Sequence, residues 1–178
     1  GLAGRGVVDA HVPGGVGGSE EYLVRQLLGL HEMGEGWRPR VAAARGLTAA
    51  HPDLAAVVDM IEPEFESSHR VRRVLGESTW LRRHSRGAAL VHHGGGTAPP
   101  RATTPYVLTI HDLQFLTYPQ YFSRLKRAYL GALIPRSARR AAVIAVPSDY
   151  VRTSVVRAYG VDEARVMVRL NHVNLVQV

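Results

Sequence analysis

Short apolar runs recur along this chain, and longer stretches with helical spacing of apolar residues separate them. Runs of this kind, rich in valine and isoleucine and bounded by turn residues, are typical of buried strands. They predict strands at Val7–Val12, Val41–Ala44, Val57–Ile61, Ala88–His92, Tyr106–Ile110, Val143–Val146 and Arg165–Leu170.

The stretches between these runs predict helices. In the first of them, Leu23 and Leu27 keep helical spacing behind Ser19, which is a favourable N-cap residue. Pro135 is expected to interrupt a later helix, because proline removes a backbone donor. The helices are expected at Ser19 to about Met33, Ser67–Arg86, Pro119 to about Arg140, and Asp149–Tyr159, the last ended by Gly160.

Strands that alternate with helices predict an α/β fold with a doubly wound, mostly parallel sheet and helices on both faces. The 178 residues suffice for one such domain with a real core but not for two. The sequence has no cysteine, which excludes disulfides, thiolate metal sites and a cysteine nucleophile. Without a signal-peptide pattern or a run of about 18 apolar residues, a cytoplasmic location is expected.

The formal charge of +7 and the pI of 10.4 raise the question of nucleic-acid binding. Lys126 is the only lysine, and aromatic residues that could stack on bases do not alternate with the arginines. We therefore expect no nucleic-acid partner. The arginines of the helix at 67–86 form either a solvated face or a contact with an anionic membrane surface or an acidic acceptor, and their spacing decides neither.

Small and polar residues follow four of the expected strands, at the ends where open α/β sheets bind ligands. The first group is a glycine turn, Gly17-Gly18-Ser19, which opens a helix and could bring backbone N–H groups close to an anion. Its spacing is neither that of a dinucleotide-binding fingerprint nor that of a P-loop. The turn could equally be a tight connection without a ligand.

Histidines follow the fourth and fifth strands. His111 could contact a phosphate or a sugar hydroxyl, act as an acid or base, or simply bond a backbone carbonyl, while Asp112 could cap the next segment. His92 and His93 are adjacent on a strand and point to opposite faces, so no metal site is expected. The glycines that follow them, 94–96, let the loop pass close to a substrate or another segment.

Ser148 follows the sixth strand in the sequence Pro147-Ser148-Asp149. The surroundings lack the G-x-S-x-G pattern of a hydrolase nucleophile. We therefore expect Ser148 to be a helix N-cap.

Taken in order, these segments resemble the N-terminal domain of the family 4 retaining glycosyltransferases, which have the GT-B fold. The resemblance spans nearly the whole chain. It is carried by Gly17–Leu23, His92–Thr97, Thr109–Leu113, Tyr118–Ser123, Ile144–Ser148 and Tyr159–Val161.

The resemblance implies a transferase that passes a sugar from a UDP- or GDP-sugar to a hydroxyl acceptor with retention of configuration, without a metal or cofactor. His111 would be catalytic and would contact the donor sugar near its leaving phosphate. The other residues implied on the donor side are Gly17, Gly18, Ser19 and Ser148. Those implied on the acceptor side are His93, Gly95, Thr97, Asp112 and Tyr118.

The same resemblance implies that residues 1–170 are a Rossmann-like half of a GT-B enzyme, and that residues 171–178 begin an interdomain linker or form a tail. The C-terminal donor-binding domain would be missing, so the isolated chain would be inactive. A peripheral contact at the inner face of the membrane remains open. The alternatives are a non-catalytic α/β module that binds a phosphorylated small molecule or a partner protein, and a Ser/His hydrolase.

Overall fold

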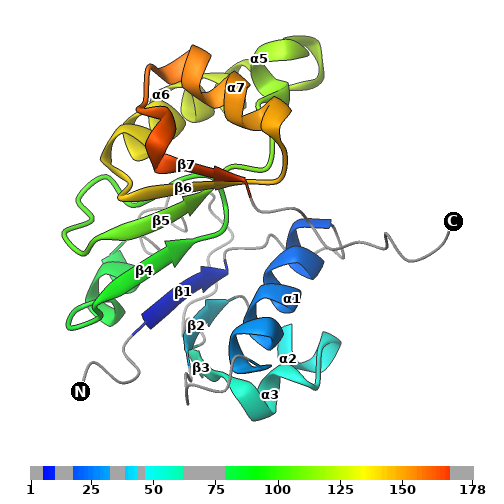
Figure 1. Ribbon diagram of the computed structural model, residues 1–178, viewed down its shortest axis with the longest axis vertical. Coiled ribbons are helices and arrows are strands. Elements are labelled where there is room, and N and C mark those ends of the chain that lie inside the picture. Colours follow the sequence, from blue (N-terminus) through cyan, green and yellow to red (C-terminus); the bar gives the residue numbers. More distant parts are fainter. Residues whose placement is uncertain (1–5, 11–17, 33–38, 44–46, 62–78, 169–178) are drawn as a thin grey trace, which may run out of the picture.

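The computed structural model describes residues 6–10, 18–32, 39–43, 47–61 and 79–168 (Figure 1). Its strands form one seven-stranded sheet in the order β3-β2-β1-β4-β5-β6-β7, and every neighbouring pair is parallel. A strand is therefore found at each of the seven places where the sequence predicts one, although residues 11–12, 44 and 169–170 of the expected ranges lie outside the described residues, as does the expected linker or tail at 171–178. The strands are β1 (Gly6–Ala10), β2 (Arg40–Ala43), β3 (Asp59–Ile61), β4 (Leu90–His93), β5 (Tyr106–Thr109), β6 (Val143–Val146) and β7 (Val166–Val168).

Helices connect these strands and make the fold a doubly wound α/β domain, as the sequence predicts. A further helical stretch covers residues 79–84. The named helices are α1 (Gly18–Glu32), α2 (Leu47–Ala50), α3 (Leu54–Val57), α5 (Gln114–Thr117), α6 (Arg124–Arg140) and α7 (Asp149–Tyr159), with single 3-10 turns η1 (Pro119–Tyr121) and η2 (Glu163–Arg165).

Two apolar clusters cover the sheet, one on each face. Leu108 of β5 and Ile144 of β6 pack with residues of α6 and α7, such as Ile134 and Val155. The register of β2, β1, β4 and β5 places Val41 of β2 on the other face of the sheet from Leu108. On that face Val41 packs with the leucines of α1 and with α2 and α3. In Figure 1, α6 and α7 accordingly gather over the β6–β7 end of the sheet and α1–α3 lie beside β1–β3.

Helix α6 differs in two ways from the sequence-based expectation. It begins at Arg124 rather than Pro119, because Ser123 caps it through a hydrogen bond that its hydroxyl accepts from the Lys126 amide at 3.2 Å. It also continues through Pro135, which was expected to interrupt it. The backbone bond lost there would have joined the carbonyl of Gly131, an exposed residue whose carbonyl can bond to water instead.

Several short elements were not anticipated. The sequence pattern does not predict the four-residue helices α2, α3 and α5, and Val57, which it places at the start of a strand, ends α3 instead. The helix expected at 67–86 is described only from residue 79, where it is helical to residue 84; the rest lies outside the described residues. Helix α7 matches its expected bounds, and Gly160 ends it in a left-handed conformation with a φ of 62°.

Ser137 of α6 links this helix to the sheet. Its hydroxyl accepts a hydrogen bond from the amide of Ala98 at 2.9 Å, and its carbonyl accepts one from the hydroxyl of Tyr106 at 2.8 Å. At the end of the helix, the Arg165 guanidinium donates to the carbonyls of Arg139, at 3.2 Å, and of Ala141. These bonds join α6 to the β4–β5 loop, to β5 and to η2, the turn that precedes β7.

Two buried tyrosines provide a matched test of this bonding. Burial raises the pKa of Tyr159 to about 12, and within the described residues its hydroxyl has no hydrogen-bond partner. Tyr159→Phe should leave the free energy of unfolding unchanged or raise it, since it removes an unsatisfied buried group. Tyr106→Phe should lower it by about 1 kcal/mol, because it breaks the bond to Ser137.

Denaturant unfolding of the two variants and the wild type measures this difference. An equal loss of stability in both variants would show that the Tyr159 hydroxyl is as well satisfied as that of Tyr106.

Candidate functional site

The residues singled out at strand ends lie along one edge of the sheet, because all the strands are parallel. Strands β1, β4, β5 and β6 are consecutive neighbours, so the loops after them are also neighbours. Gly18 opens α1 after the first of these loops, His111 lies two residues beyond β5, and Ser148 two residues beyond β6. The expected alignment on one edge is confirmed for these three residues, while Gly17 lies outside the described residues.

His111 is the best-defined polar side chain on this edge. Its Nε2 lies 3.2 Å from the carbonyl oxygen of Gly94, and a carbonyl only accepts, so Nε2 carries the hydrogen. Burial lowers the pKa of His111, against smaller raising effects of the Gly94 hydrogen bond and the Asp112 charge. The ring is therefore neutral at pH 7, with Nδ1 as its acceptor nitrogen.

Gly94 brings a third element to the same place. A Cβ atom built on Gly94 would lie 2.7 and 2.8 Å from the two terminal methyl carbons of Leu23, a buried residue of α1. The loop after β4 therefore approaches α1 as closely as the absence of a side chain allows, while bonding His111 through its carbonyl. The close approach expected of residues 94–96 is thus to a helix side chain.

Residues 92 and 93 lie on opposite faces of β4, and only one shares the face of His111. His93 is 2 % exposed and packs edge-on against the Tyr106 ring, with centroids 5.2 Å apart. His92 bonds Thr109 of β5 through Nε2 and the Thr109 hydroxyl at 2.7 Å. His111 follows Thr109 by two residues and so shares its face. His93, implied by the resemblance on the acceptor side, therefore lies on the opposite face from His111.

Two other implied residues stabilise turns. Ser148 caps α7 as expected, since its hydroxyl accepts a bond from the Val151 amide at 3.3 Å. The Asp112 carboxylate accepts one from the Gln114 amide at 3.0 Å and so initiates α5. Gly95 and Tyr118 are exposed, and Thr97 is half-buried.

Ser19, expected as the N-cap of α1, lies inside the helix, because α1 begins one residue earlier at Gly18. The first turn contains two acidic residues, Glu20 and Glu21. The Glu21 carboxylate accepts a bond from Nε of Arg25, one turn further along, at 2.7 Å. Arg25 thus offsets one of the two negative charges that the first turn adds beside the partial positive charge of the helix N-terminus.

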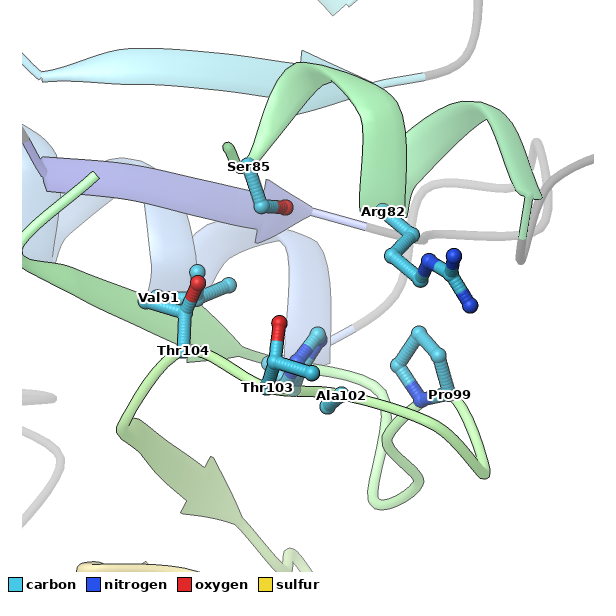
Figure 2. Close-up of a pocket in the computed structure, with 8 residues that line it drawn as sticks. Arg82, Ser85, Val91, Pro99, Ala102, Thr103 and Thr104 are labelled. Carbon is cyan, nitrogen blue, oxygen red and sulfur yellow. The ribbon is translucent and has the colours of Figure 1, made fainter. Parts of the chain in front are cut away.

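A small cavity lies on the face opposite His111 and is separate from this edge. Figure 2 shows Arg82 on the helical segment above it, Ser85 in the turn that follows that segment, and Thr103 and Thr104 on the loop below. His93 also lines it, and its volume is about 20 Å³. That volume holds about one water molecule, which is too little for a sugar or a nucleotide.

The described part of the chain holds no cluster of three or more side chains suited to a metal ion. None of the described helices combines the length and the apolar character needed to cross a membrane.

A family model for Glycosyltransferase Family 4 matches residues 16–177. Among solved structures, HepE from Anabaena in complex with UDP and glucose is similar with a TM-score of 0.63 and 16% identity, over 94% of this chain and 44% of that one. A putative UDP-N-acetylglucosamine 2-epimerase from Listeria monocytogenes gives 0.63 and 12%, over 92% and 44%. UDP-GlcNAc 2-epimerase from Methanocaldococcus jannaschii gives 0.59 and 7%, over 93% and 45%.

At these identities the structures establish the fold, which is that of one GT-B half. The chain spans less than half the length of each of these proteins. No protein of curated function matches the sequence.

The contact between Gly94 and Leu23 can be tested with two glycine variants. Gly94→Ala should lower the free energy of unfolding by about 1–3 kcal/mol, because the buried Leu23 methyls must move. Gly131→Ala is the matched control: it lies within α6, nothing lies within 4 Å of the added methyl, and alanine should stabilise the helix by about 0.5–1 kcal/mol. Thermal unfolding of both variants is the measurement, and a neutral Gly94→Ala would contradict the close approach.

Proposed function

Because this chain belongs to Glycosyltransferase Family 4, we propose that it is the acceptor-side domain of an enzyme that transfers a sugar from a nucleotide-sugar donor to a hydroxyl group, with retention of configuration. In that reaction the bond between the anomeric carbon and the diphosphate oxygen breaks, the acceptor oxygen bonds to the same face of the sugar, and the proton of the acceptor hydroxyl passes to the departing diphosphate. The products are a glycoside and a nucleoside diphosphate. The observation that carries the proposal is the position of His111, between the end of β4 and the end of β5 and on the edge where α1 begins.

The donor diphosphate would bind at the start of α1, through Gly17, Gly18 and Ser19. Backbone N–H groups in the first turn of a helix have no partner within the helix, and the helix dipole favours an anion there. The bond between Glu21 and Arg25 supports this assignment, because it engages one of the two acidic side chains of that turn, Glu20 and Glu21, further along the helix. Ser148, at the start of α7 on the same edge, would bound the donor site.

His111 would contact the donor sugar near its leaving phosphate. The carbonyl of Gly94 fixes the ring through Nε2, so the ring holds one orientation before a substrate arrives. Since burial lowers the pKa of His111, a neutral ring meets the substrate at pH 7. A neutral imidazole can exchange hydrogen bonds with sugar hydroxyls without placing a full positive charge in the site.

The acceptor would bind beside His111, near Gly95, Thr97, Asp112 and Tyr118. The half-buried Thr97 and the exposed residues of this set come from the loops after β4 and β5. His93 is not part of this proposal, because it is buried on the other face of β4. The chemical identity of the hydroxyl compound stays outside the proposal.

A second domain would complete the site and bind most of the nucleotide. The share of the similar structures that this chain covers, 44–45%, supports that arrangement. UDP in the structure of HepE supports a uridine nucleotide as the donor, with a GDP-sugar as the alternative. The absence of cysteine is compatible with a cytoplasmic enzyme.

The two-domain arrangement predicts that the isolated chain transfers no sugar. The donor would meet only one wall of its site, so neither binding nor charge stabilisation would be complete. The measurement is release of nucleoside diphosphate from UDP- and GDP-sugars, with a cell extract as the source of acceptors. It compares this chain with the longest protein that its gene encodes, and turnover by the isolated chain alone would contradict the proposal.

The role of His111 predicts that His111→Ala lowers kcat far more than it lowers stability. A hydrogen bond to a charged group contributes roughly 1.5–3 kcal/mol, or about ten- to hundredfold in rate if it forms mainly in the transition state. His92→Ala is the matched control, since it removes a histidine of the same face that bonds Thr109. It should lower the melting temperature and leave kcat per folded molecule near the wild-type value.

The kcat and the melting temperature of both variants are measured in the longest protein that the gene of this chain encodes. If kcat for His111→Ala matched that for His92→Ala, His111 would be a structural residue.

A further inference from the structure

The outward side of α6 and the turn before it expose large apolar side chains that a soluble domain normally buries. Tyr121 is 80% exposed, Leu125 77% and Tyr129 41%. Leu125 and Tyr129 are four residues apart on α6 and lie one turn above another, whereas Tyr121 lies in the turn η1 that precedes the helix. Together with Arg124, Arg136 and Arg139 they are called the α6 face below.

The opposite side of the helix is firmly packed, so these side chains cannot turn inward. Ile134, Ser137 and Ala138 are buried against the sheet. The bonds of Ser137 to Ala98 and Tyr106 fix the rotation of α6 about its axis. The exposure of the α6 face is therefore a fixed property of the packed helix.

The charged residues in and around α6 are all positive. Residues 113–148 contain six cations and no aspartate or glutamate, although the chain as a whole has 15 acidic residues. Two of these cations bond within the domain, Lys126 over the Phe122 ring and Arg140 to the carbonyl of Pro100. Arg136 and Arg139 are exposed on the same side of the helix as Leu125 and Tyr129, and the exposed Arg124 precedes them.

We infer that the α6 face binds an anionic lipid surface, with α6 lying parallel to that surface. Leu125 and the tyrosines would enter the boundary between headgroups and acyl chains, where a ring with one polar end is favoured. The arginines would contact lipid phosphates at the same depth. A purely electrostatic partner would not account for the aliphatic and aromatic residues, and a purely apolar partner would not account for the uniform positive charge.

This inference does not depend on the proposed sugar transfer. Binding to lipid is measured without any donor or acceptor, so its failure and the failure of the proposed reaction are separate results.

The test is co-sedimentation of the longest protein encoded with vesicles of phosphatidylcholine, alone or with about a third phosphatidylglycerol. Wild-type protein should sediment with the anionic vesicles and remain in solution with the neutral ones. Leu125→Gln combined with Tyr129→Gln should weaken binding at least about tenfold. Arg136→Gln combined with Arg139→Gln should weaken it by about fivefold per arginine, with a smaller difference at high salt.

Matched controls lie elsewhere on the domain. Leu90→Gln replaces a leucine that is 42% exposed on the face of the sheet opposite α6, and Arg157→Gln removes an exposed arginine of α7. Both should bind vesicles like the wild type, and melting temperatures establish that every variant is folded.

Three outcomes would overturn the inference. The first is that the wild type fails to bind anionic vesicles, which would mean that another domain covers the α6 face. The second is that the control variants lose as much binding as the α6 variants. The third is that Leu125→Gln converts a dimer to a monomer in solution, which would assign the face to a second copy of the chain.

Discussion

The parallel direction of all strands is the constraint on which the rest of this structure depends. A parallel neighbour can be reached only by a crossover, so each strand ends at the same edge and the chain returns over one of the two faces. Four consecutive strands, β1, β4, β5 and β6, therefore present their following loops side by side. Residues separated by about a hundred positions in sequence, such as Gly18 and His111, come to one edge for this reason alone.

Alternation within the strands then decides which side chains can act together. On one face of the sheet at β4 and β5 lie His92, Thr109 and, just beyond β5, His111, and this is the face that α1 covers. On the other face His93 and Tyr106 pack beneath α6. Two adjacent histidines thus have different surroundings, and only the register of neighbouring strands fixes which of them accompanies His111.

The sequence is sufficient to predict the sheet and the longer helices, since valine-rich runs and leucine spacing are strong local signals. It also predicts the cap at Ser148, because serine is favoured at the N-cap and the aspartate after it is favoured in the first turn of a helix. It does not predict that Pro135 remains in a helix, because proline disfavours a helix interior and only the assembled helix shows that Gly131, whose carbonyl loses its bond, is an exposed residue. Nor does it place His93, because the parity of a strand relative to its neighbours is a property of the assembled sheet. The contact between Gly94 and Leu23 is hidden for the same reason, as it joins segments about seventy residues apart.

The bonds of Ser137 and Arg165 fix α6 to the β4–β5 loop and β5 in its C-terminal half, and to η2, the turn before β7, at its end. A partner that binds the α6 face therefore also fixes the orientation of the whole sheet relative to that partner. On a bilayer, that orientation would set the angle between the carboxyl edge of the sheet and the plane of the lipids. An acceptor confined to that plane would then be reached by a search in two dimensions, at one fixed angle to the carboxyl edge of the sheet.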